Sequence, residues 1–139
     1  MFNGKSKAVT FSYDDGVTQD IRLVEMLNKY GLKATFNINS ELLGKSGELS
    51  RGGTKVSHNK VNPCDVRSIY SGHEVAVHTL THPNLTTLED TEVIRQVETD
   101  RLNLSELCGY EVVGMAYPCG GVNNDDRVAE IIHEHTGVK

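Results

Sequence analysis

Tryptophan is absent from the 139 residues, and cysteine and proline occur only three times each. Cys64, Cys108 and Cys119 are odd in number and show no C-x-x-C spacing, so nothing predicts a disulfide framework or a cysteine zinc site. Basic residues are outnumbered by acidic ones, which leaves a formal net charge of -5. Because binding to a phosphate backbone needs clustered positive charge, we expect no nucleic-acid partner.

Long apolar runs are missing as well. Residues 1–7 carry some positive charge, but no apolar segment follows them, and no stretch of the chain approaches the length of a membrane span. We therefore expect no membrane partner and a cytoplasmic location for the sequence as it stands. Action outside the cell or on the cell wall is not excluded, because a removed signal segment would leave the same sequence.

What is present is an alternation of strand-like and helix-like segments in a chain of single-domain size. Residues 44–62 are polar, lack a sustained apolar period and are predicted to form an exposed loop. Short β-branched and aromatic runs predict strands at residues 8–13, 34–38, 74–77 and 112–117. Apolar residues at helical spacing predict helices at residues 21–30, 63–70, 86–108 and 125–136.

Strands that alternate with helices predict right-handed parallel βαβ units, in one domain spanning residues 1–139. Four such units form either a small open sheet or half of a barrel, and we expect an α/β fold that is the first part of a distorted, TIM-like (β/α) barrel. In parallel α/β folds, functional side chains gather at the carboxyl ends of the strands. Three distant segments are therefore predicted to meet at one rim, where they bring Asp14, Asp15, His78 and Pro118.

Two adjacent carboxylates, Asp14 and Asp15, stand between the first predicted strand and Gly16. They repel each other unless a cation offsets their charge or their pKa values separate. His78 and His82 are four residues apart, a spacing that places two imidazoles on one side of a helical turn. One carboxylate with two histidines is a ligand set for a catalytic zinc-like ion, and the second carboxylate is then free to take a proton from water.

Other charged residues are interpreted as structural. Asp125 and Asp126 follow Asn124 in the first turn of a predicted helix, where negative charge favours the helix dipole. His73, at the entrance to a strand, is expected to be hydrogen-bonded. The remaining histidines are expected to face solvent or to pack against their neighbours: His58, His133 and His135.

The sequence resembles the polysaccharide deacetylases, carbohydrate esterase family 4, whose NodB-homology domain removes acetyl groups from N-acetylated sugars. Residues 10–16, Thr-Phe-Ser-Tyr-Asp-Asp-Gly, are similar to the family motif T-F-D-D-G but two residues longer. Residues 78–82, His-Thr-Leu-Thr-His, match the family motif H-[ST]-x-x-H. The two motifs occur in the family's order.

This resemblance implies a hydrolase that cleaves the C–N bond of an acetamide on a polysaccharide or amino sugar. One divalent metal ion, which is zinc, cobalt or manganese, would be bound by Asp15, His78 and His82. The resemblance makes Asp14 the catalytic base and an N-acetylated carbohydrate the partner of the site.

The family's third motif, R-x-P-[aromatic]-G, looks like residues 116–120, Ala-Tyr-Pro-Cys-Gly. Pro118 and Gly120 are retained and are expected to contribute to substrate binding. Ala116 stands where the family has an arginine that holds the base, so the base needs another source of orientation here. Cys119 replaces the aromatic residue, and its backbone N–H is expected to serve catalysis by stabilising the oxyanion.

The family's later L-x-H motif, which supplies the acid for the leaving amine, has no match in this sequence. We therefore expect the C-terminal part of the family's domain to be missing. The open sheet edge then predicts either a second copy of the chain that covers it or marginal stability. Turnover by the chain itself is left open. The alternatives are a non-catalytic remnant that binds metal or carbohydrate, and a related barrel hydrolase that acts on a non-sugar amide.

Overall fold

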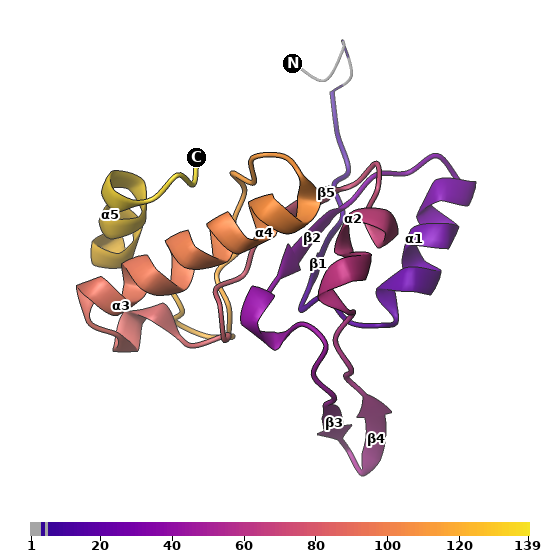
Figure 1. Ribbon diagram of the computed structural model, residues 1–139, viewed down its shortest axis with the longest axis horizontal. Coiled ribbons are helices and arrows are strands. Elements are labelled where there is room, and N and C mark those ends of the chain that lie inside the picture. Colours follow the sequence, from indigo (N-terminus) through magenta and orange to yellow (C-terminus); the bar gives the residue numbers. More distant parts are fainter. Residues whose placement is uncertain (1–3, 5) are drawn as a thin grey trace.

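A three-stranded parallel sheet runs through the middle of this computed structural model, which describes residue 4 and residues 6–139 (Figure 1). The strands lie side by side in the order β1 (Ser12–Asp14), β2 (Thr35–Ile38) and β5 (Glu74–Val77). Both neighbouring pairs are parallel, so the predicted βα units are confirmed. The carboxyl ends of all three strands therefore lie along one edge of the sheet.

The helices that follow β1 and precede β5 lie side by side. α1 (Asp20–Lys29) buries Val24 and Leu27 and ends at a tight turn with Gly31 in the left-handed region, as the sequence predicts. α2 (Val66–Ile69) continues a single 3-10 turn that begins at Pro63, and it packs against α1. In the described residues, no helix combines the length and the apolar character needed to cross a bilayer.

One long helical segment leads from the histidine loop to the next part of the sheet. It consists of α3 (Asp90–Ile94), a π-helical turn (Arg95–Thr99) and α4 (Asp100–Cys108), and it ends at Gly109 with φ 76°. The helix begins four residues later than predicted. The reason is that the Asn84 side chain accepts the Thr86 N–H at 3.0 Å and holds a separate 3-10 turn there.

The predicted strand at residues 112–117 is reduced to one parallel bridge between Met115 and Val77. Its ladder consists of the Val77 N–H donated to Gly114 O and the Ala116 N–H donated to Val77 O, both at 2.9 Å. The segment therefore extends the sheet beyond β5, but only over a short distance. α5 (Asp126–His135) follows and packs against α3. The Asp125 carboxylate caps α5, in agreement with its predicted structural role.

The predicted loop at residues 44–62 is exposed over most of its length, as expected, but it contains an antiparallel hairpin. β3 (Glu48–Arg51) pairs with β4 (Thr54–Ser57), and the hairpin extends away from the rest of the molecule (Figure 1). Gly52 and Gly53 connect the strands with positive φ values of 54° and 80°, which suit a two-residue hairpin turn. The polar composition concealed this hairpin because neither strand has a buried face.

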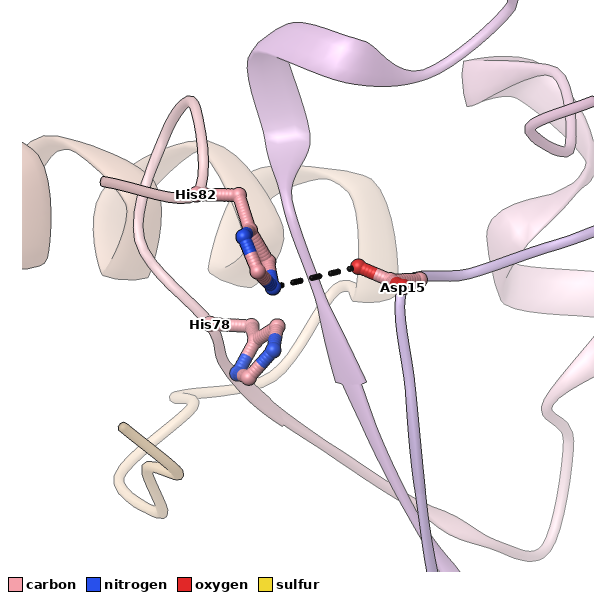
Figure 2. A group of neighbouring side chains, drawn as sticks. All are labelled: Asp15, His78 and His82. Carbon is pink, nitrogen blue, oxygen red and sulfur yellow. Dashed lines mark ion pairs between the residues drawn. The ribbon is translucent and has the colours of Figure 1, made fainter. Parts of the chain in front are cut away.

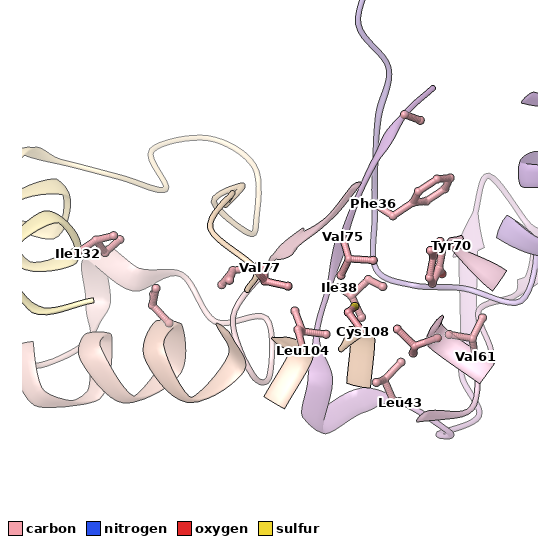
Figure 3. Packing of buried hydrophobic residues seen from close by; sticks show 14 of the residues in the cluster. Phe36, Ile38, Leu43, Val61, Tyr70, Val75, Val77, Leu104, Cys108 and Ile132 are labelled. Atoms are coloured by element: carbon pink, nitrogen blue, oxygen red, sulfur yellow. The ribbon is translucent and has the colours of Figure 1, made fainter. Parts of the chain in front are cut away.

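The core includes one face of β2 and β5, to which the paired residues Phe36 and Val75, and Ile38 and Val77, both point. Phe36 and Ile38 from β2, with Val75 and Val77 from β5, are almost completely buried, and Leu104 of α4 packs with them (Figure 3). Burial of each such side chain contributes about 1.5–3 kcal/mol. This packing fixes the strand ends that carry the polar residues described next.

Candidate metal centre

Asp15 lies in the sharp turn that follows β1. Its backbone is left-handed, with φ 82°, and its N–H donates to the carbonyl oxygen of Asn37 at 2.8 Å. The next residue, Gly16, also has a positive φ, and a Cβ atom there would lie 3.1 Å from the Ile38 side chain. The close approach to β2 therefore requires glycine, and it fixes the position of the Asp15 carboxylate.

His78 and His82 follow the end of β5 and face this carboxylate (Figure 2). One ligand atom from each of Asp15, His78 and His82 lies within 4.8 Å of the others. Asp15 Oδ1 is 3.7 Å from His82 Nε2, and the two imidazole rings cross at 68° with centroids 4.9 Å apart. The structure thus brings together the three residues that the sequence predicts as ligands.

The two histidines do not share a helical turn, contrary to the spacing argument. Residues 78–82 form an irregular bend in which Thr79 and His82 adopt left-handed φ values of 67° and 63°. The Thr79 hydroxyl accepts the His82 N–H at 3.1 Å and stabilises the bend. A bend of this kind brings positions i and i+4 together as a helix does, which explains why the spacing still predicted the pair.

The His78 ring has a defined role for each nitrogen. Nδ1 lies 2.9 Å from the carbonyl oxygen of Ala116, so Nδ1–H donates there and the lone pair of Nε2 is left for a metal ion. Burial lowers the pKa of His78, which keeps the imidazole neutral and competent as a ligand. Ala116 thus contributes to the site through its backbone rather than through a side chain.

A buried carboxylate holds the backbone on which His78 stands. Asp100 accepts the N–H groups of His78 at 3.1 Å and of Ser40 at 2.7 Å, and it joins the ends of β2 and β5 to α4. Burial raises the pKa of Asp100 to about 7, although these hydrogen bonds oppose the shift. Sequence reasoning missed Asp100, because a helical aspartate gives no sign that its side chain is buried.

Two basic residues from the end of the hairpin segment also contact the Asp15 carboxylate. His58 Nε2 lies 3.2 Å from Asp15 Oδ2, so the expectation that His58 faces solvent or merely packs is wrong. Lys60 Nζ lies 3.5 Å from Asp15 Oδ1 and donates to the Asp15 carbonyl oxygen at 2.8 Å. Burial lowers the pKa of Lys60, and the Asp15 carboxylate opposes the shift. No motif in the sequence indicates either contact.

Asp14 has a different neighbour. The Asn37 amide donates to Asp14 Oδ1 at 2.6 Å, and Asn37 is buried directly opposite Asp14 in the register of β1 and β2. Ala116 has no side chain that can hold a carboxylate. The sequence therefore left open what orients Asp14, and in the structure Asn37 provides this contact. Asp14 itself is exposed and accessible to a substrate.

The loop after the fourth segment of the sheet reaches the histidines. Pro118 is buried, whereas Cys119 and Gly120 are exposed. Cys119 Sγ lies 3.8 Å from His82 Nδ1, and Cys119 has a left-handed φ of 70°. Asn123, which sequence reasoning missed, donates to the carbonyl oxygens of Pro118 at 3.1 Å and Cys119 at 2.9 Å. Of the predicted residues of this loop, Cys119 therefore lies beside the ligand cluster.

This set of donors suits one divalent ion. A carboxylate with two imidazoles matches the donors found in catalytic zinc sites, and ions such as cobalt and manganese accept the same atoms. The side chains of Asp15 and His82 are 25% and 34% exposed, so the cluster is open to solvent on one side. An ion held there would keep positions accessible to water and substrate.

The chain is similar to known deacetylases in sequence and in fold. The family model described as polysaccharide deacetylase matches residues 3–136. The peptidoglycan-N-acetylglucosamine deacetylase PgdA of Listeria monocytogenes is 29% identical over 129 residues, which cover 91% of this chain and 24% of that protein. The chitooligosaccharide deacetylase of Bradyrhizobium is 29% identical over 107 residues, which cover 74% of this chain and 41% of that protein.

Among solved structures, the deacetylase PplD of Streptococcus pyogenes, determined in complex with acetate, is similar to this chain with a TM-score of 0.77. The two are 19% identical, and the similarity covers 96% of this chain and 54% of PplD. The likeness confirms the predicted α/β fold built from the first parallel βα units. The chain spans about a quarter of the length of the Listeria relative and about half of PplD.

Proposed function

This chain belongs to the polysaccharide deacetylase family, and we propose that it hydrolyses the acetamide of an N-acetylated carbohydrate with one divalent metal ion. The observation that carries the proposal is the convergence of Asp15, His78 and His82, with ligand atoms within 4.8 Å of one another. The two relatives are named for action on peptidoglycan and on chitooligosaccharides. We therefore propose N-acetylated glycans of this kind as the class of substrate.

Asp15, His78 and His82 would hold the ion, which is zinc, cobalt or manganese. When bound, it polarises an acetamide carbonyl and makes water more acidic. The chain supports this function in two ways: the Ala116 carbonyl fixes the tautomer of His78, and Asp100 fixes the backbone of the same residue. The ligands would thus keep their geometry while the substrate enters.

Asp14 would be the base that accepts the proton of the attacking water. Its neighbour Asn37 holds one carboxylate oxygen, and the exposed position of Asp14 lets the other meet the substrate. The backbone N–H of Cys119 would stabilise the oxyanion of the reacting carbonyl, a role that needs no side chain. Pro118 and Gly120 would shape the rim against which the sugar lies.

An assay of acetate release tests the proposal. The chain is incubated with chitooligosaccharides or peptidoglycan fragments and with zinc, cobalt or manganese. We expect metal-dependent release that Asp14→Asn lowers by at least about 100-fold, because a general base contributes about that factor or more. Asp126→Asn, which changes an exposed aspartate in α5, is the matched control and should keep its activity. Equal rates for the wild type and Asp14→Asn would contradict the role of the base.

The alanine at position 116 favours a second candidate function, in which the chain binds metal or carbohydrate without turnover. An arginine at this position would hold the base, and the shorter side chain removes that contact. The same assay separates the two functions. Stoichiometric metal binding with glycan binding but no acetate release by this chain would favour the second.

A further inference from the structure

We propose that the Lys60 ammonium stays beside the Asp15 carboxylate and competes with the metal ion for it. Its positive charge lowers the affinity of the site for the ion below the affinity that Asp15, His78 and His82 would give alone. The inference rests on the metal site of the proposed function and deepens it. It concerns a residue outside the motifs that predict the site. Its basis is the position of one ammonium group.

The ammonium of Lys60 shares an oxygen with the ligand cluster. Nζ lies 3.5 Å from Asp15 Oδ1, and the same oxygen lies 3.7 Å from His82 Nε2. The ligand edge of the carboxylate thus faces an imidazole on one side and a lysine on the other. A divalent cation bound through Asp15 would lie near the positive charge of Lys60.

The chain holds this ammonium in place. The Lys60 N–H donates to Lys45 O at 2.9 Å, and residue 60 forms an antiparallel bridge with Val17, next to the Asp15 turn. The Lys60 side chain is only 8% exposed, and Nζ donates to the Asp15 carbonyl oxygen at 2.8 Å. The ammonium therefore cannot move into solvent without exposing its buried stem and losing this hydrogen bond.

His58 completes the arrangement. Its Nε2 lies 3.2 Å from Lys60 Nζ and 3.2 Å from Asp15 Oδ2, so the two oxygens of the carboxylate have separate neighbours. His58 orients the carboxylate through Oδ2, whereas Lys60 opposes positive charge at Oδ1. The two residues contact the same ligand but have different expected effects on metal binding.

The effect on affinity has two parts. Without metal, the Lys60 ammonium offsets the repulsion between Asp14 and Asp15 and stabilises the folded chain. With metal, the same ammonium is repelled by the divalent charge. Binding is weakened by this repulsion and by the part of the attraction between Lys60 and Asp15 that is lost when the ion takes Oδ1, because affinity measures the difference in free energy between the two states. The charge, rather than the packing of the stem, accounts for the weakening.

The test compares zinc binding by the wild type with binding by Lys60→Gln and Lys60→Arg, measured as competition with a chromophoric chelator. We expect Lys60→Gln to bind zinc about tenfold more tightly, because two charges a few ångströms apart near a surface interact with about 1–4 kcal/mol. Lys60→Arg keeps the charge and should stay within about twofold of the wild type. Lys55→Gln is the matched control: it removes a lysine from β4 whose side chain is 71% exposed.

Thermal unfolding without and with zinc provides an independent readout. Lys60→Gln should melt at a lower temperature than the wild type without zinc and should gain a larger increase when zinc is added. A purely structural lysine would lower the first temperature without enlarging the increase. Lys60→Met, which keeps the apolar stem, should give the same pattern if the glutamine variant folds poorly.

The outcomes separate this inference from the proposed function. Equal or weaker zinc binding by Lys60→Gln, with wild-type binding that His82→Ala abolishes, would overturn the inference and leave the metal site intact. Binding by Lys60→Gln but not by the wild type would support it in its strongest form. No binding by either protein would overturn the metal site, and the inference with it.

Discussion

At the scale of single residues, Asp14 and Asp15 are neighbours in the chain with different surroundings. Asp14 is held by the amide of Asn37 at 2.6 Å, whereas Asp15 faces His82 and Lys60. The repulsion between the two carboxylates is thus offset by separate groups, a hydrogen-bond donor for one and positive charge for the other. The arrangement fits the proposed division of roles, in which Asp15 binds a metal ion and Asp14 accepts a proton.

The contact between Asn37 and Asp14 leads to a prediction about the rate. Asn37→Leu should lower the rate of deacetylation by about tenfold or more, because a base displaced by about 1 Å loses much of its effect. Zinc affinity, measured by chelator competition, should stay within about twofold, because the three ligands keep their positions. Ser12→Ala removes the other side-chain partner of the same amide, at 2.8 Å, and is the control. An unchanged rate in Asn37→Leu would show that another group orients Asp14.

The clustering of Asp15, His78 and His82 could be predicted from the sequence, but most of the residues that hold them in place could not. Asp15 and His78 follow short β-rich runs, and the strand-end rule therefore places them together. Lys60, Asp100 and Asn37 reach the site only through long-range packing. Their residue types have ordinary structural uses, so the sequence offers no pattern that distinguishes them.

At the scale of elements, the hairpin of β3 and β4 is connected to the segment that carries His58 and Lys60 at the pair formed by Gly47 and His58. Gly47 and His58 are already linked by a 2.8 Å hydrogen bond from the His58 N–H to the Gly47 carbonyl, so the chain could close there without β3 and β4. All eight residues of these strands are exposed. His58 and Lys60, which contact Asp15, lie outside β3 and β4, in the part of the chain that would remain.

Replacement of residues 48–57 by Asn-Gly should therefore preserve the fold and the metal site. We expect the free energy of unfolding to change by less than about 1 kcal/mol, because both strands are exposed and the Gln19 amide, which loses the Ser57 carbonyl oxygen, can bond to water instead. Zinc affinity should stay within about twofold. Denaturant unfolding and chelator competition measure the two quantities. A large loss of affinity would mean that the outer hairpin orders His58 and Lys60.

A buried carboxylate at the start of α1 predicts a pH dependence. Asp20 accepts a hydrogen bond from the Tyr70 hydroxyl of the turn after α2 at 2.7 Å, and burial raises its pKa to about 6 from 3.8. Between about pH 4 and pH 6, Asp20 thus keeps its proton in the folded chain, whereas it has already lost this proton in the unfolded chain. Stability contributed by this group is present below about pH 4 and is lost as the pH rises to about 6.

Asp20→Asn should remove this dependence and keep an acceptor for the Tyr70 hydroxyl. At pH 7 the variant should be more stable than the wild type by up to about 3 kcal/mol, because one pKa unit corresponds to about 1.4 kcal/mol. At pH 4 the two proteins should be nearly equal. Urea unfolding from pH 4 to 7 measures the difference, with Glu25→Gln on the exposed face of α1 as the control. Parallel pH profiles for the wild type and Asp20→Asn would contradict the assignment.

Elements with a clear apolar pattern were predicted closely, and those set by local side chains were not. β2 and β5 match their predicted runs to within one residue, because both are buried and rich in β-branched or aromatic residues. The start of α3 was displaced by the Asn84 turn, and the segment at 112–117 forms only a single bridge. β3 and β4 have no buried face, so their mostly polar composition concealed them.

At the scale of the whole molecule, the site joins the end of β1, the loop after β5 and the loop that carries Cys119. These segments are far apart in the sequence, so the ligand cluster exists only when the chain is folded. An ion that binds the folded chain and not the unfolded one stabilises the fold by mass action. Metal binding should therefore be visible as a change in stability.

Addition of zinc should raise the melting temperature, and a chelator should reverse the rise. At a free zinc concentration about 1,000 times the dissociation constant, the stabilisation should be about 4 kcal/mol. His82→Ala should melt near the metal-free wild type and should not respond to zinc. An equal zinc response in the wild type and His82→Ala would place the binding elsewhere in the molecule.

Zinc stoichiometry and affinity, measured by titration calorimetry, test the central claim that Asp15, His78 and His82 bind one metal ion while Asp14 does not. The wild type should bind one ion per chain. Asp15→Ala and His82→Ala should lose more than about 100-fold in affinity, because loss of a ligand costs more than the roughly 10–100-fold known for residues that hydrogen-bond to a ligand. Asp14→Asn should stay within about threefold of the wild type. Affinity retained by Asp15→Ala and His82→Ala would contradict the account.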